Sequence, residues 1–130
     1  MARPRPLEGV KILIVEDDFL IAEDLHELIV RSGGEVAGSA VTAEQALAMA
    51  ETKSIDVAVL DILLGGGKSG AVAQALRRRG VPFVVATGYG QEAIPEEMRD
   101  APILHKPFSR KDLVDRLRQS LAAAEPGRTA

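Results

Sequence analysis

Hydrophobic residues along the chain fall into short continuous runs, separated by segments in which they recur at helical spacing. The longer runs are rich in valine and isoleucine and show little polar alternation. Such runs are typical of strands that are buried on both faces of a parallel sheet. We therefore expect strands at residues 10–15, 56–60 and 81–86, and shorter ones at 35–38 and 102–104.

The segments between these runs carry helix signals. Residues 19–31 place leucine and isoleucine at helical spacing, and Gly33-Gly34 follows as a terminator. A helix is also expected over roughly residues 70–79. Two sequences have the form of capping boxes that begin further helices, namely Thr42-x-x-Gln45 and Ser109-x-x-Asp112.

Strand and helix thus alternate about five times, which predicts an α/β fold with a doubly wound five-stranded parallel sheet and helices on both faces. We expect one domain over residues 8–122, with flexible tails at 1–7 and 123–130. Ligands of such sheets bind at the carboxyl ends of the strands. Candidate functional residues should therefore be sought where the predicted strands end.

Composition narrows the classes of function. A net charge of -3 with 27% charged residues provides no basic field for nucleic acid or for an anionic membrane. One Tyr and three Phe, without Trp, are too few for a surface that stacks bases. The chain lacks Cys, which excludes disulfides and thiolate metal sites, and no apolar run is long enough for a signal peptide or a membrane span. We expect a cytoplasmic protein that binds neither nucleic acid nor membrane.

Charged and hydroxyl residues directly follow the predicted strands. Glu16 and Asp17 come after the first, Asp61 after the third, Thr87 after the fourth and Lys106 after the fifth. Carboxylates held close together raise one another's pKa, so the arrangement needs a cation such as Mg²⁺, which prefers oxygen ligands. Lysine adds a positive charge and threonine a hydrogen-bond donor. These parts suit phosphoryl transfer through an aspartyl phosphate.

Each of these residues also has a simpler interpretation. Glu16-Asp17-Asp18 could cap the following helix, and Asp18 is expected to do so. Asp61 alone could be a turn residue, and Thr87 and Lys106 alone could be structural. Because all of these residues directly follow predicted strands, their combination favours the interpretation as a site for phosphoryl transfer.

The strings around these residues resemble a known family. ILIVEDD, VAVLDILL, VVATGYG and HKPFS are similar to the receiver domains of bacterial two-component systems, and the similarity covers nearly all of the chain. The resemblance implies a flavodoxin-like fold, a Mg²⁺ or Mn²⁺ cofactor and a Lys106-Pro107 bond that is often cis, as X-Pro bonds allow. It implies Asp61 as phosphoacceptor and metal ligand, Asp17 as a direct metal ligand, Glu16 as a ligand through water, the Leu63 carbonyl as another ligand, and Thr87 and Lys106 as phosphoryl-binding residues.

The same resemblance implies a phosphorylation-dependent signalling switch in a phosphorelay. The donor would be a sensor histidine kinase or a histidine phosphotransfer protein, and a downstream protein would respond to the phosphorylated state. Ala-Thr-Gly-Tyr with a later Lys-Pro-Phe is similar to an alphaproteobacterial subgroup named for Phe-Ala-Thr-Gly, although Val85 replaces that Phe. We expect no DNA-binding output domain and no enzymatic activity beyond self-phosphorylation and dephosphorylation. The oligomeric state is open, and a homodimer is one possible state.

One departure from the family concerns switching. Many receivers have an aromatic switch residue three positions before the active-site lysine, where this chain has Ile103. Tyr89 lies between two glycines and two residues after Thr87, so we expect it to switch instead. It would move with residues 88–98, because residues 91–98 have too weak an apolar pattern to resist.

Two other functions would use parts of the same pattern. A small metal-dependent phosphatase or phosphotransferase would use the same aspartyl chemistry, but such enzymes usually carry a second Asp where Leu63 stands. A degenerate receiver that binds partners without phosphorylation would lack the acceptor or an acidic ligand, and both are present. Gly67-Lys68-Ser69 mimics the end of a nucleotide-binding P-loop, but the first glycine of that motif would fall at Ile62.

Overall fold

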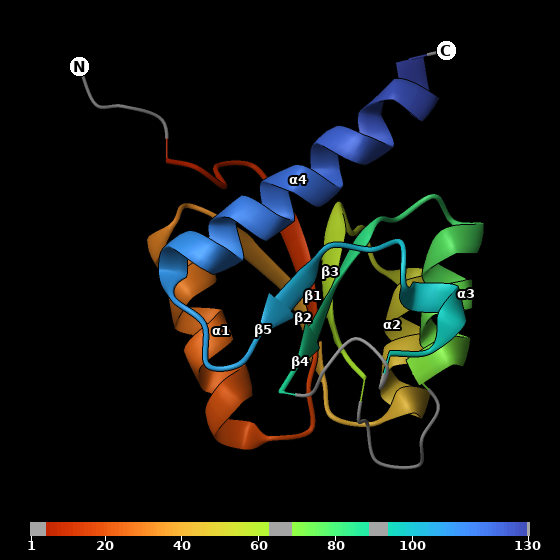
Figure 1. The fold of residues 1–130 in the computed structure, drawn as a ribbon, viewed down its shortest axis with the longest axis horizontal. Helices are drawn as coiled ribbons and strands as arrows, with labels where there is room; N and C mark the ends of the chain where they lie inside the picture. The colour runs from red at the N-terminus through yellow and green to blue at the C-terminus, as the bar shows by residue number, and fades with distance from the viewer. Residues whose placement is uncertain (1–4, 63–68, 89–93, 130) are drawn as a thin grey trace.

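The computed structural model describes residues 5–62, 69–88 and 94–129, and the side chains of Glu97 and of residues 125–129 are outside its description. Five parallel strands form one sheet in the order β2-β1-β3-β4-β5 (Figure 1). The strands are β1 (Lys11–Val15), β2 (Glu35–Ala40), β3 (Val57–Asp61), β4 (Phe83–Thr87) and β5 (Ile103–His105). The predicted fold class is confirmed.

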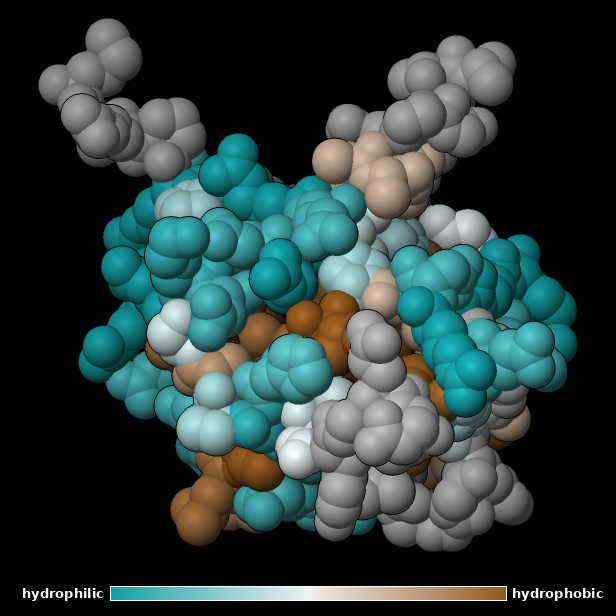
Figure 2. All heavy atoms as spheres, viewed as in Figure 1, coloured by the Kyte–Doolittle hydropathy of each residue, from teal (hydrophilic) through white to brown (hydrophobic). Residues whose placement is uncertain are grey.

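Helices cover both faces of this sheet. Helices α1 (Phe19–Arg31) and α4 (Arg110–Thr129) pack on one face, and α2 (Ala43–Thr52) and α3 (Ser69–Arg78) pack on the other (Figure 1). Successive strand residues point to opposite faces, so Leu13 joins the α2 and α3 side while Ile14 joins the α1 and α4 side. Hydrophilic residues cover most of the described surface in the same view (Figure 2).

Local capping signals set the helix starts. In α1, the Asp18 carboxylate accepts hydrogen bonds from the backbone N–H groups of Leu20 and Ile21. In α2, the Thr42 hydroxyl accepts from Gln45 N at 3.1 Å, and the Gln45 side chain accepts from Val41 N at 2.9 Å. The cap predicted at Asp18 and the box predicted at Thr42 are thus confirmed.

The ends of the chain differ from the expected loose tails. Leu7 is fully buried among the residues beneath α1 and α4, and its N–H donates to the Ser32 carbonyl at 2.9 Å. At the other end, α4 continues to Thr129 instead of ending near residue 122 (Figure 1). The high helix propensity of Ala122-Ala123-Ala124 accounts for the extension past residue 122, whereas Pro126 and Gly127 do not favour a helix.

The connection between β4 and β5 is also better anchored than its sequence pattern suggests. Residues 96–98 form a 3₁₀ turn, η2 (Glu96–Met98). Ile94 and Met98 are buried in the core beside α3, and the Arg99 side chain donates to the Ile94 carbonyl at 3.0 Å. The described part of residues 91–98 therefore has two side chains that anchor it to the core, which the weak apolar pattern of this stretch did not indicate.

Replacing Leu7 tests whether the N-terminal segment belongs to the folded core. Leu7→Ala should lower the free energy of unfolding by about 2 to 5 kcal/mol, because it leaves a cavity under α1 and α4. The neighbouring exposed Glu8 provides the control, and Glu8→Ala should have little effect. Chemical denaturation measures both, and equal stability of the two variants would place Leu7 outside the core.

Candidate functional site

The carboxyl ends of the strands form one edge of the sheet. The register pairs Val15 with Leu60, Asp61 with Ala86 and Thr87 with His105. The residues that follow β1 and β5 therefore lie beside those that end β3 and β4. The order in which strands are added to the sheet also reverses at β1, since β2 lies on one side of β1 and β3 lies on the other. Such a switch point is where open α/β sheets bind ligands.

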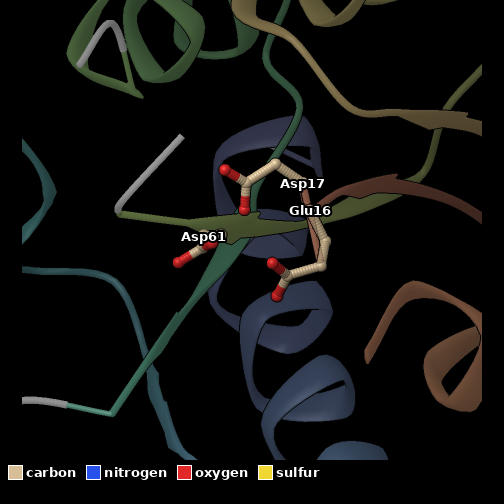
Figure 3. A group of neighbouring side chains, drawn as sticks. All are labelled: Glu16, Asp17 and Asp61. Carbon is tan, nitrogen blue, oxygen red and sulfur yellow. The ribbon is translucent and has the colours of Figure 1, made fainter. Parts of the chain in front are cut away.

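Three carboxylates meet at this edge. Glu16, Asp17 and Asp61 each offer an oxygen, and these oxygens lie within 4.8 Å of one another (Figure 3). Glu16 and Asp61 are buried, whereas Asp17 is exposed. Burial, together with the nearby Asp61, raises the pKa of Glu16 to about 7. The three carboxylates thus favour binding of a cation or contact with a positively charged side chain.

Lys106 supplies part of that positive charge. Its Nζ donates to Glu16 Oε1 at 2.8 Å and lies 3.6 Å from Asp61 Oδ1. Burial lowers the pKa of Lys106, but the hydrogen bond to Glu16 and the charge of Asp61 outweigh it and raise the pKa above its usual value. The Lys106 side chain therefore stays positively charged beside Glu16 and Asp61. The Lys106-Pro107 peptide bond is cis, as expected.

Thr87 and Asp18 complete the edge in different ways. Thr87 ends β4, is buried, and accepts a backbone hydrogen bond from Lys106 N at 2.9 Å. The backbone N–H of Asp18 donates to the Glu16 side chain at 3.1 Å, while the Asp18 carboxylate caps α1. Asp18 thus supports the Glu16 carboxylate and the helix, and belongs to neither the metal cluster nor the lysine contact.

A cavity of about 240 Å³ opens among these residues, large enough for a phosphoryl group beside a partly hydrated ion. Its lining combines acidic, basic and apolar residues from the end of β3, from the segments that follow β1, β3, β4 and β5, and from α1: Glu16, Asp17, Asp18, Ile21, Asp61, Ile62, Gly88 and Lys106. All-oxygen donors suit a hard divalent cation such as Mg²⁺.

The sequence of this chain matches a known family of protein domains. The sequence model of the response regulator receiver domain matches residues 12–118. The chain belongs to this family of receiver domains. The family predicted from the sequence strings is confirmed, and receiver domains act in two-component signalling.

Several relatives of the receiver are regulatory proteins. The transcriptional regulatory protein PdtaR of Mycobacterium tuberculosis is 33% identical over 108 residues, covering 80% of this chain and 53% of PdtaR. The phyllosphere-induced regulator PhyR of Methylorubrum extorquens is 36% identical over 104 residues, covering 77% of this chain and 39% of PhyR. The receiver thus spans about half or less of the length of these proteins.

A solved structure is similar over nearly its whole length. The solution structure of SdrG from Sphingomonas melonis Fr1 is 40% identical, with a TM-score of 0.73, and the match covers 96% of this chain and 99% of that one. In the described part of the receiver, no helix is both long and apolar enough to cross a bilayer.

Two of the receiver's predicted site residues, Leu63 and Tyr89, lie outside the described residues. Ile103 is partly buried and pairs with Val85 at the start of β5. The other predicted residues, from Glu16 to Lys106, come together at one edge as described above.

Sequence reasoning missed one residue of the receiver, Ser69. Its hydroxyl lies 2.9 Å from the Asp61 carbonyl and 3.0 Å from the Ile62 carbonyl. In the sequence this serine stands eight residues after Asp61, at the end of the string Gly67-Lys68-Ser69, and neither feature shows which carbonyls its hydroxyl reaches.

Proposed function

We propose that this receiver accepts a phosphoryl group on Asp61 and signals through its phosphorylated state. The observation that carries the proposal is the meeting of three carboxylates with Lys106 at the switch point of the sheet. A nucleophilic carboxylate needs neighbouring positive charge, because the incoming phosphoryl group is itself negative. Lys106 provides part of that charge, and a divalent cation provides the rest.

The proposed cation is Mg²⁺ or Mn²⁺, held by Glu16, Asp17, Asp61 and the backbone carbonyl of Leu63. Glu16 would act through a bound water. When bound, the ion would neutralise the carboxylates and offset the charge on the phosphoryl oxygens. The close oxygens of the three acidic side chains, and the pKa of Glu16 raised by burial, support the assignment.

In the proposed reaction, the carboxylate of the buried Asp61 is the nucleophile. One carboxylate oxygen of Asp61 forms a bond to phosphorus, while the bond from phosphorus to the donor's histidine nitrogen breaks and the nitrogen keeps the electron pair. Lys106 and Thr87 would bind the phosphoryl oxygens, since both groups lie at the same sheet edge. Lys106 can interact with Asp61 both before and after phosphorylation, because it contacts Glu16 and Asp61 together.

The proposed partners follow from this chemistry. The donor is a sensor histidine kinase or a histidine phosphotransfer protein, and a downstream protein reads the result. The receiver catalyses only its own phosphorylation and dephosphorylation. The position of the chain within the receiver family, and its relatives PdtaR and PhyR, which are named as regulators, support a signalling role.

The switch is proposed to involve Tyr89 and the segment 88–98, in place of the aromatic residue that many receivers carry where Ile103 stands. Phosphorylation can bias only an element whose two states contact the site differently. Gly88 lines the cavity with Asp61 and Lys106, so this segment begins at the site. Ile94 and Met98 anchor its other end in the core, which means that movement must either end before Ile94 or withdraw both side chains.

Replacing Asp61 tests the acceptor. Incubation with acetyl phosphate and Mg²⁺ should add one phosphoryl group to the wild-type protein, as measured by intact mass, and none to Asp61→Asn. Asp24→Asn changes an exposed carboxylate on α1 and should leave labelling intact. Persistent labelling of Asp61→Asn would show that the acceptor is another residue.

Metal binding should depend on Asp17 and not on its neighbour Asp18. Asp17→Ala should weaken Mg²⁺ binding by roughly tenfold or more, because losing a ligand costs at least as much as losing a group that orients one. Asp18→Ala should cost about 1 kcal/mol of stability through the lost helix cap, with Mg²⁺ affinity nearly unchanged.

Calorimetric titration of both variants with Mg²⁺, together with thermal unfolding, separates these effects. If Asp17→Ala bound Mg²⁺ as tightly as the wild type, the metal site would have to lie elsewhere.

Amide hydrogen exchange tests the proposed switch. Adding beryllofluoride with Mg²⁺ should change protection within residues 88–98, because the phosphoryl-like group contacts the site where this segment begins. Tyr89→Ala should reduce the change. If protection there stayed constant while other segments responded, Tyr89 would not be the switch.

A further inference from the structure

Ser69 is the first residue of α3 and is almost fully buried, with 3% of its surface exposed. Its hydroxyl lies between two successive carbonyl oxygens, 2.9 Å from that of Asp61 and 3.0 Å from that of Ile62. One hydroxyl therefore contacts two successive peptide groups, the one that joins Asp61 to Ile62 and the one that follows Ile62. It joins the start of α3 to the end of β3.

These two carbonyls lie where the sheet stops supporting the chain. Asp61 is the last residue of β3, and its register with β4 ends at Ala86, while the register with β1 ends one residue earlier, at Leu60. Because the peptide group is planar, restraining its carbonyl limits the ψ angle of that residue and the φ angle of the next. The Ser69 hydroxyl, whose one proton serves both carbonyls, thus restrains the backbone beyond the reach of the β1 ladder.

We infer that Ser69 is a positioning residue for phosphoryl transfer, because its hydroxyl holds the backbone of Asp61 and Ile62 and thereby aims the Asp61 carboxylate. The inference rests on the proposed function of Asp61. Ser69 acts through the backbone and does not touch the reacting atoms. Positioning matters here because a carboxylate nucleophile must stay aligned with both Lys106 and the metal.

The alternative is that Ser69 only ties α3 to the sheet. The receiver contains a matched serine that separates the two roles. Ser120 is also 3% exposed, and its hydroxyl donates to the Phe83 carbonyl at 3.2 Å, at the start of β4 and thus at the opposite edge of the sheet. Removing either hydroxyl takes a buried hydrogen bond from a strand carbonyl, but only Ser69 adjoins the acceptor.

The experiment compares Ser69→Ala, Ser69→Thr and Ser120→Ala in the full chain. Phosphorylation by acetyl phosphate is followed by intact mass over time, at limiting and at saturating Mg²⁺, well below the unfolding temperature of each variant. Ser69→Ala should slow phosphorylation by roughly tenfold, which is typical of residues that orient ligands of a metal site. Ser69→Thr keeps the hydroxyl and should restore most of the rate, whereas Ser120→Ala should react like the wild type.

The outcomes distinguish the inference from the function on which it rests. If Ser69→Ala reacts at the wild-type rate, or if Ser120→Ala is slowed equally, Ser69 has no positioning role while Asp61 remains the acceptor. If the wild-type protein itself gains no phosphoryl group, the proposed function fails and the inference fails with it. Should Ser69→Ala not fold, Ser69→Cys keeps the side-chain volume with a much weaker donor and takes its place in the same comparison.

Discussion

Negative charge concentrated at one edge of the sheet is the constraint on which the rest of this structure depends. Glu16 and Asp61 are buried beside the exposed Asp17, with ligand oxygens within 4.8 Å of one another. Two like unit charges about 5 Å apart repel by roughly 3 kcal/mol at an effective dielectric constant of about 20, which is a large share of a typical domain stability. Lys106 offsets part of this repulsion, and the raised pKa of Glu16 shows that burial and Asp61 still disfavour its charge.

The remainder of the fold holds these charges in place. The central strands β1, β3 and β4 are apolar and almost entirely buried, and they fix the backbone up to the strand ends. Helices on each side cover two separate clusters of core residues. The Asp18 cap sets the start of α1 directly after the acids, and Ser69 connects α3 to the end of β3. The apolar core, the helix cap and the Ser69 contact thus hold the repelling acidic groups of the site in place.

Local signals explain why much of this was predictable from the sequence. The apolar runs, the cap at Asp18 and the capping box at Thr42 each act within a few residues, and the parallel topology then brings Glu16, Asp61 and Lys106 to one edge. The features that the sequence did not reveal are contacts between residues distant in sequence. The burial of Leu7 against α1 and α4, and of Ile94 and Met98 beside α3, depends on partners that no local pattern reveals. The role of Ser69 was missed for the same reason, since a hydroxyl in sequence does not show which carbonyls it will reach.

The acidic edge is proposed to bind a divalent cation together with a phosphoryl group on Asp61. A crystal structure of the wild-type receiver with Mg²⁺ and beryllofluoride tests it most directly. We expect beryllium bonded to an Asp61 carboxylate oxygen, the metal contacted by Asp17 and Asp61, and the fluorides contacted by Lys106 and Thr87. Beryllofluoride bound to another side chain, or bound at Asp61 without metal at the acidic cluster, would contradict it.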